Sequence, residues 1–327
     1  MNHYRQSSKY DVNDNNIFFS LVNYRNEFFS SKDPLKIIEF FDSFENKYSL
    51  INWMKERPHG ACKIHEVNGD KDIIAIILTA DYSGKYSWAC RNEVFHGIHM
   101  IFVESGEAPD PYFNISHNKN EGLKLALQYN PKWIIISNDD VFKVEDIKIL
   151  KKELLTFDSN KYDVIRITEG KYHSRNFYIG LTTKLYSLYI FLTRNNISKQ
   201  LLRLQKKFDV RYNMGDWKAK YLRVLKKTIR YVDDTNFYIL SGQYVEKQNG
   251  QIFDEVFINH REDTDFSLQI KYTNLNDGIA RFQIGDLIGS TLGTGPDREM
   301  RKLASDIYFN YKWSSFLEKQ QSKDLTE

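Results

Sequence analysis

The sequence predicts an α/β protein with a mainly parallel sheet, because short apolar runs alternate with helical patterns along residues 72–167. Residues 133–136 are a solid apolar run, typical of a strand buried on both faces. The run ends abruptly in Asn138, Asp139 and Asp140, at the end of a parallel strand, where open α/β sheets bind ligands. Because clustered carboxylates repel each other unless a cation lies between them, we expect a divalent metal with an anionic ligand here.

The elements before this strand are predicted from apolar periodicity and from start signals. Asp33 and Pro34 form a helix start, with an acidic N-cap followed by proline at the first helical position. The expectation is a frayed polar start at 1–32, a helical preamble at 34–57, strands at 72–79, 99–103 and 112–116, and helices at 86–95 and 121–129.

The elements after residue 136 follow the same rules until a basic segment interrupts them. A helix carries apolar positions at Ile147, Leu150 and Leu154, and the basic segment is expected to be helical with Leu201, Leu204 and Phe208 on one face. The further expectation is strands at 162–167 and 236–240, an alternating stretch at 279–292, turns at 289–297 and a helix at 298–316.

The net charge of +3 conceals a strong asymmetry along the chain. Residues 171–230 hold fifteen Lys and Arg side chains against Asp209 and Asp216, a local balance of +13, so the remainder carries about −10. A basic segment on an acidic body indicates an anionic partner, which is a membrane surface, a nucleic acid or a polyanionic substrate.

Composition and length narrow the class of protein. A chain of 327 residues with 41% hydrophobic content can bury a sizeable core. Cys62 and Cys90 indicate ordinary thiols in a reducing compartment. The polar N-terminus has no signal-peptide pattern, and the longest apolar candidate for a span, residues 179–192, is broken by polar residues. We therefore expect a cytoplasmic protein, either soluble or peripheral at the membrane.

Two acidic clusters carry the chemistry. The first is Asp139 and Asp140 with Asn138, and the second is Glu262, Asp263 and Asp265 at a predicted helix start. A solvated loop is the alternative for the first cluster, and helix-dipole stabilisation is the alternative for the second. Together in one βαβ chain the clusters indicate a metal site and a general base in one cleft.

Seven segments spread over roughly residues 72–290 form an ordered set of motifs: DIIAIILTADYSG, MIFVESGE, HNKNEGLKLAL, IIISNDDV, SGQ, FDE and EDTDFSLQI. This set resembles family 2 glycosyltransferases of the GT-A fold, which use nucleotide sugars and are usually inverting. The resemblance implies a GT-A-like, Rossmann-type, mainly parallel sheet flanked by helices. It also implies an N-terminal helical extension at 1–70, a nucleotide-sugar-binding half at 71–170, a basic helical insertion at 171–235, an acceptor half at 236–295, and a C-terminal helix and tail at 296–327.

The resemblance also implies roles for single residues. Asp263 becomes the general base that deprotonates the acceptor hydroxyl. A divalent cation, Mn²⁺ or Mg²⁺, is implied at Asp140, Asn138 and Asp286, where it neutralises the leaving diphosphate. The implied nucleotide-sugar contacts are Thr79, Ala80, Asp81, Glu104, Ser105, Lys119, Asn120, Asn138 and Asp139, and the implied acceptor-side residues are Gly242, Glu262 and Asp265.

The sequence departs from the family pattern at three places. Asn138 stands where the family usually has the first metal-motif aspartate, and Asn ligates only through a neutral carbonyl or through water. Asp286, in GDLIGST, stands where the family often has a histidine. Ala80 and Asp81 replace a Tyr-Asn pair, which removes a possible aromatic stack on the base.

The implied partners are a nucleoside-diphosphate sugar donor and a glycan, lipid-linked or protein acceptor, with weak contact to an anionic membrane surface and no specific nucleic acid. The alternatives are a sugar nucleotidyltransferase, a nucleic-acid-binding protein using the basic segment, and a degenerate transferase that binds sugar nucleotides without turnover. The absence of G-x-G-x-x-G, P-loop and G-x-S-x-G motifs disfavours dehydrogenases, NTPases and hydrolases. The eight histidines lack pairwise metal-ligand spacing, and six of them are interpreted as surface or core residues: His65, His96, His99, His117, His173 and His260.

Overall fold

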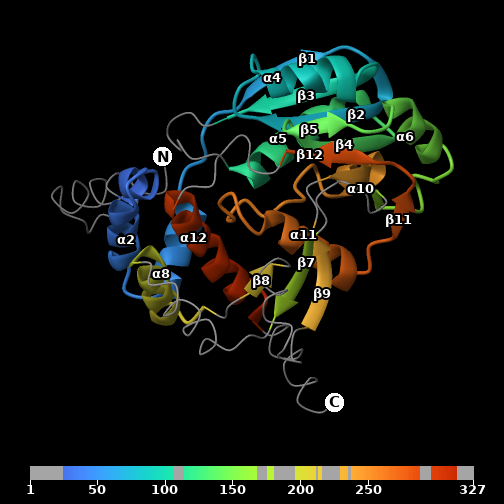
Figure 1. Cartoon of the computed structure of the whole chain (residues 1–327). Coiled ribbons are helices and arrows are strands. Elements are labelled where there is room, and N and C mark those ends of the chain that lie inside the picture. Colours follow the sequence, from blue (N-terminus) through green and yellow to red (C-terminus); the bar gives the residue numbers. More distant parts are fainter. Residues whose placement is uncertain are drawn as a thin grey trace, which may run out of the picture.

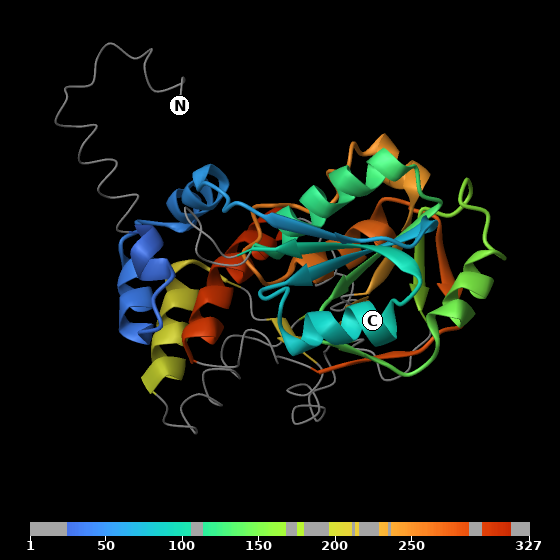
Figure 2. The same cartoon turned by 90° about the horizontal axis from the view of Figure 1, so that it is seen from above.

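A computed structural model gives the fold for residues 25–105, 114–167, 175–179, 196–210, 213–215, 229–234, 237–287 and 296–314. Its central feature is a seven-stranded sheet with helices on both faces (Figure 1; Figure 2). The strands, in their order across the sheet, are β1 (Lys63–Val67), β3 (Ile98–Glu104), β2 (Asp70–Thr79), β4 (Trp133–Asn138), β10 (Tyr238–Ser241), β6 (Val164–Ile167) and β11 (Asp277–Ala280).

The predicted α/β class is confirmed, but the sheet is mixed. β3, β2 and β4 are parallel neighbours, whereas β1 and β10 run against the strands beside them. β11 is parallel to β6, so β1 and β10 are the two reversed strands of the seven. The strand β1 was not predicted, because its residues are exposed or half-buried at the sheet edge and show no apolar run.

Alternating side chains of the central strands enter two separate cores. Ile73, Ala75 and Ile77 of β2 face a core closed by α6 (Ile147–Leu154) and by the π-helical turn at Cys90–Val94, which follows α4 (Lys85–Ala89). Ile74 and Ile76 face the opposite core, closed by α5 (Ile115–Ala126), α10 (Gly242–Lys247) and α11 (Glu262–Tyr272). Burial on both faces explains why these strands were visible in the sequence as continuous apolar runs.

A layer of four helices with its own core lies beside the sheet (Figure 1). These helices are α2 (Pro34–Asp42), α3 (Lys47–Glu56), α8 (Asn196–Lys207) and α12 (Pro296–Lys312). The Asp33 side chain accepts a hydrogen bond from the Leu35 amide at 2.9 Å, which confirms the predicted helix start. Leu204 and Phe208 are buried in this layer, as predicted.

Three predictions of secondary structure are wrong in part. The preamble at 34–57 is two helices, because Asn46 starts a second one with a capping box. The strand expected at 112–116 is absent at its described end, since Asn114 caps α5 and helical geometry begins at Ile115. The basic insertion is not wholly helical: β7 (Arg175–Ile179), β8 (Asn213–Gly215) and β9 (Ile229–Asp234) form an antiparallel sheet.

Some predictions fall outside the described part of the chain. They concern residues 1–24, 112–113, 171–174, 180–195, 211–212, 216–228, 235–236, 288–295 and 315–327. Within the residues described, no helix has the combination of length and apolar character that crossing a bilayer requires.

Gly242 begins α10 where the chain leaves β10, against the backbone that leads into β4. Its amide donates to the Lys132 carbonyl at 2.9 Å. A Cβ atom at this position would lie 1.9 Å from the Pro131 carbonyl oxygen. Since the obstacle is backbone, a side chain here cannot be accommodated by a rotamer change.

We predict that Gly242→Ala destabilises the protein by about 1–3 kcal/mol, the usual cost of overpacking, measured by urea unfolding. The matched control is Glu246→Ala, which changes an exposed residue on the same short helix and should leave stability nearly unchanged. Equal stability of the two variants would contradict the packing role of Gly242.

Candidate functional site

The carboxyl ends of β3, β2 and β4 lie side by side and bring several predicted residues together. Thr79 pairs with Glu104, and Leu78 pairs with Asn138, in the parallel registers on either side of β2. We call this end of the sheet the carboxyl edge, defined by Thr79, Glu104 and Asn138. Ligands of open α/β sheets bind at this position.

Asp139 is turned into the protein just beyond the carboxyl edge. Its Oδ2 accepts hydrogen bonds from Thr79 Oγ1 at 2.7 Å and from Ser87 Oγ at 3.5 Å, and its side chain is buried. Its amide donates to the Leu78 carbonyl, and Cys90 Sγ donates to its carbonyl oxygen. Thr79 and Asp139, expected to contact the nucleotide, therefore bond to each other and fix the turn.

Glu104 takes part in a second cluster at the same edge. Its carboxylate accepts from the Tyr82 amide at 3.2 Å and lies 2.9 Å from His65 Nε2. The Tyr82 ring stacks on His65 with centroids 3.9 Å apart, and the Arg91 guanidinium lies 4.3 Å from the Tyr82 centroid. The family pattern has an aromatic residue where this chain has Ala80. Tyr82 supplies an aromatic surface in the same turn, two residues later.

The neighbouring turn residues are arranged as a compact loop. The carboxylate of Asp81 accepts from the Ser83 amide at 3.0 Å and from Ser83 Oγ at 2.6 Å, while Ala80 is exposed. Ser105 Oγ accepts from Asn118 Nδ2 at 2.6 Å, which ties the end of β3 to α5.

Asp140 and Asp286, predicted as metal ligands, lie next to each other. They adjoin a two-stranded ladder of β5 (Val141–Lys143) and β12 (Ile284–Asp286), in which Asp286 pairs with Val141. The Leu287 amide donates to the Asp140 carbonyl oxygen at 2.8 Å. The ladder therefore brings the backbones of Asp140 and Asp286, two half-buried residues almost 150 positions apart in the sequence, close together beside Asn138.

The start of α5 also reaches this edge. Because β3 and β4 are both parallel to β2, the helix that connects them runs back along the sheet and begins at the carboxyl edge. It packs closely there, since a Cβ on Gly122 would lie 2.5 Å from Ile76 Cγ2. Lys119, one turn earlier, is buried with its Nζ 4.6 Å from the Phe253 ring centroid.

Both the nitrogen and the oxygen of the Asn120 side-chain amide form hydrogen bonds within the protein. Its Nδ2 donates to the Phe253 carbonyl and to Glu255 Oε1, both at 2.8 Å. Its Oδ1 accepts from the amides of Ile252 and Phe253. This residue, expected to contact the nucleotide, holds the loop at 252–255 instead.

The second acidic cluster reaches the carboxyl edge from α11. Tyr238 pairs with Ile136 near the end of β4, and its hydroxyl donates to the Asp263 carbonyl oxygen at 3.1 Å. The first turn of α11 therefore lies at the same end of the sheet as Asn138. Asp263 is half-buried, and its Oδ1 accepts from the Thr264 amide at 2.8 Å.

Glu262 is the most perturbed carboxyl group of this cluster. Its side chain is 6% exposed, and no hydrogen-bond partner contacts Oε2 within the described residues. Burial, followed by the charge of Asp263, raises the pKa of Glu262 to about 7, against the opposing charges of Lys119 and Arg298. A carboxyl group with this pKa exchanges protons near neutral pH, which suits acid–base chemistry.

Two predicted residues are directed elsewhere. Asp265 faces α12, where its carboxylate accepts from Lys312 Nζ at 2.9 Å and Trp313 Nε1 at 2.8 Å. Gly242 lies at the opposite end of the sheet, because β10 is antiparallel and Ser241 pairs with Trp133. The prediction that Gly242 lies on the acceptor side of the site at the carboxyl edge is therefore wrong. The SGQ motif could not reveal this, because it carries no information about strand direction.

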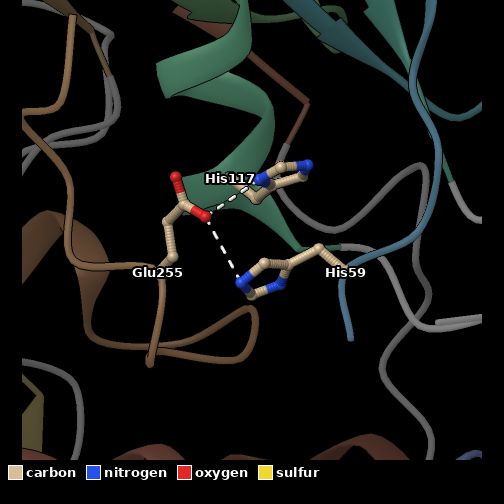
Figure 3. A group of neighbouring side chains, drawn as sticks. All are labelled: His59, His117 and Glu255. Atoms are coloured by element: carbon tan, nitrogen blue, oxygen red, sulfur yellow. Dashed lines mark hydrogen bonds and ion pairs between the residues drawn. The ribbon is translucent and has the colours of Figure 1, made fainter. Parts of the chain in front are cut away.

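A cluster that the sequence analysis missed joins His59, His117 and Glu255 (Figure 3). Glu255 Oε2 lies 2.9 Å from His117 Nδ1 and 3.3 Å from His59 Nε2. Hydrogen bonds to Cys62 and Glu255 raise the pKa of His117 to about 10, whereas burial and the charge of His117 lower the pKa of His59. No local spacing could have revealed the cluster, because its members come from three separate segments.

Burial alone would raise the pKa of Glu255. Hydrogen bonds from His117, Asn120 and Gln251 outweigh this effect and hold the pKa at about 2. His117, expected to be an ordinary surface or core residue, is thus part of a charged and hydrogen-bonded centre.

The chain matches no family model, and no curated protein is significantly similar to it. The carboxyl edge brings together the backbones of Asp140 and Asp286, the neighbouring carboxyl groups of Glu262 and Asp263, and the buried cation of Lys119. This arrangement can bind a hard cation, neutralise a phosphate and accept a proton.

We predict that Glu262 makes the stability of the protein depend on pH. Its pKa is near 4.5 when unfolded and about 7 when folded, so the unfolded chain loses the proton first and stability falls as pH rises from 4.5 to 7. The stability of Glu262→Gln relative to wild type should be greater at pH 8 than at pH 4.5 by on the order of 3 kcal/mol.

The measurement is urea unfolding of both proteins at the two pH values, with exposed Glu246→Gln as the control. A wild-type-minus-variant difference that stays constant with pH would show that Glu262 titrates normally in the folded state.

Proposed function

We propose that the protein is a metal-assisted glycosyltransferase of the GT-A fold, which moves a sugar from a nucleoside-diphosphate sugar to an acceptor hydroxyl with inversion. The observation that carries the proposal is that four acidic residues from distant segments lie at one end of the sheet. Asp140 immediately precedes β5, Asp286 ends β12 beside it, and Glu262 and Asp263 lie in the first turn of α11. Cation binding and proton acceptance are the two requirements of this reaction.

The donor would lie across the carboxyl edge. Asp140, Asp286 and the Asn138 carbonyl offer oxygen ligands, which hard divalent cations such as Mn²⁺ or Mg²⁺ prefer. When bound, such a cation supplies charge neutralisation for the diphosphate leaving group. Lys119 adds a positive charge at the start of α5, where a phosphate is also favoured by the helix N-terminus.

The nucleoside would lie at the ends of β2 and β3, beside the Glu104 cluster. Glu104 can accept from a base or a ribose hydroxyl, and the stacked His65 and Tyr82 rings offer an aromatic surface next to it. Asp81 and Ser105 are on the two turns that border this place.

The acceptor would approach from the side of α11, where Asp263 removes the proton of its hydroxyl as that oxygen attacks the anomeric carbon. Attack from the side opposite the diphosphate gives inversion. Glu262 holds a second exchangeable proton site next to Asp263. Asp265 supports the helix through α12 and takes no part in the chemistry.

A glycan, a lipid-linked glycan or a protein remains the proposed acceptor class, and an anionic membrane surface remains a proposed weak partner. Contacts of the α8 helix reduce the charge available for binding such a membrane. Arg203 and Lys207 lie within ion-pair distance of Asp42, so an acidic residue of the same chain neutralises part of the positive charge of the basic segment.

We predict that binding of a nucleoside diphosphate requires a divalent cation. The Asp140→Ala variant should lose this cation-dependent binding. The measurement is thermal stabilisation by nucleoside diphosphates and nucleotide sugars, with Mn²⁺ or with EDTA. Exposed Asp158→Ala is the control, and it should respond like wild type. Equal nucleotide binding by Asp140→Ala and wild type in both conditions would exclude this cation site.

We predict that Asp263→Asn lowers turnover by roughly 10²–10⁴-fold while donor binding persists, because the amide keeps the shape and loses the base. The Glu262→Gln variant distinguishes the two neighbouring carboxyl groups, because its turnover should fall less than that of Asp263→Asn. The measurement is sugar transfer with analysis of the anomeric configuration of the product. A retained configuration, or near-normal transfer by Asp263→Asn, would rule out the assigned base.

A further inference from the structure

Three side chains from three separate segments converge in a cluster that includes neither Asp140 nor Asp286. His59 lies between α3 and β1, His117 lies in the first turn of α5, and Glu255 lies in the loop between α10 and α11. His59 Nε2, His117 Nδ1 and Glu255 Oε2 all lie within 4.8 Å of one another (Figure 3). All three residues are partly buried.

Neighbouring amides hold these side chains in place. Glu255 Oε1 accepts from Asn120 Nδ2 and Gln251 Nε2, both at 2.8 Å, so Oε2 is the oxygen that faces the two imidazoles. Asn114 Nδ2 lies 3.1 Å from His59 Nδ1 and donates to the Glu255 backbone carbonyl. Outer hydrogen bonds of this kind orient ligands in metal sites.

We propose that His59, His117 and Glu255 bind a divalent transition-metal ion, of which Zn²⁺ fits best. Zn–N and Zn–O bonds of about 2.0–2.2 Å separate neighbouring ligand atoms of a tetrahedron by roughly 3.4 Å. The contacts of Glu255 Oε2, at 2.9 Å to His117 and 3.3 Å to His59, are close to that separation. Two imidazoles and one carboxylate leave a fourth position for water.

The ligand chemistry separates this site from the cation site of the proposed transferase. Imidazole nitrogen favours Zn²⁺ and its transition-metal neighbours, whereas carboxylate and carbonyl oxygens favour Mg²⁺, Ca²⁺ and Mn²⁺. Asp140 and Asp286 offer oxygen only. The proposal therefore does not depend on the glycosyltransferase assignment.

Binding requires one rearrangement. A metal ion must lie near the plane of each imidazole ring that binds it, but the two rings are stacked with an interplanar angle of 17° and centroids 4.6 Å apart. His59 therefore turns out of the stack and away from Asn114 when the ion enters, and its ring proton moves to Nδ1. It can do so because it lies in an irregular segment and its side chain is 27% exposed. The ion replaces the protons that the imidazoles now share with Glu255.

The ion would tie the helical layer to the sheet. His59 follows α3 of the helical layer, whereas His117 and Glu255 belong to elements packed on the sheet. We therefore expect the metal to stabilise the joined structure through linkage.

The test uses the full chain after dialysis against EDTA, with Zn²⁺ alone as the titrant in calorimetry and Co²⁺ as a spectroscopic substitute. We expect one saturable site per chain, a visible Co²⁺ spectrum of four-coordinate type and a raised melting temperature. His59→Ala and His117→Ala should each weaken Zn²⁺ binding at least roughly tenfold. Exposed His96→Ala and Asp140→Ala should bind Zn²⁺ like wild type.

Circular dichroism separates loss of binding from loss of folding, and His59→Ala is the informative variant because His59 lies outside helices and strands. The proposal is overturned if wild type shows no saturable Zn²⁺ site, or if folded His59→Ala and His117→Ala bind as tightly as wild type. Loss of Zn²⁺ binding in His96→Ala or Asp140→Ala would assign the ion to other residues and would also overturn it. Because Zn²⁺ binding is measured without nucleotide, it can fail or succeed whether or not the protein transfers sugars.

Discussion

The parallel pairing of β2 with β3 on one side and with β4 on the other is the constraint on which the rest of the structure depends. It brings Thr79, Glu104 and Asn138 to one edge of the sheet. It also buries the central strands on both faces, so helices must cover each face and must return along the sheet to that edge. The close approach of Gly122 to Ile76 sets how near α5 can lie, and thereby where Lys119 is held.

A second tie connects this edge to α11. The Asn120 amide closes four hydrogen bonds, three to the backbone of Ile252 and Phe253 and one to Glu255. Since that loop leads toward α11, the start of α5 also helps to position Glu262 and Asp263. Asn120, which was expected to contact the nucleotide, thus bonds to the loop of the protein itself. Replacing a buried polar group with this many hydrogen bonds is costly, because its partners are left unsatisfied.

The structural elements that could be predicted from the sequence are those that depend on local residue patterns. Continuous apolar runs identified β2, β3 and β4, and the Asp33-Pro34 pair located the start of α2. Motif order alone assigned Asp286 and Asp140 to one metal site; the ladder of β12 with β5 places the backbones of the two segments side by side, and the metal assignment stays a prediction. The strands β7 and β9 were missed in a basic segment, because their stability comes from pairing between distant residues. The His59–His117–Glu255 cluster and the position of Gly242 were missed for the same reason, since both depend on which distant segments lie together.

Glu262 offers an argument for chemistry at the carboxyl edge that does not use any resemblance. The start of a helix and the nearby charges of Lys119 and Arg298 favour a carboxylate there, while burial and Asp263 oppose it. The opposing effects are larger, because the pKa of Glu262 lies well above its ordinary value. A glutamine would fill the same space without the cost of burying a charge. Fold stability at neutral pH therefore does not account for a carboxyl group at this position, whereas proton exchange beside Asp263 does.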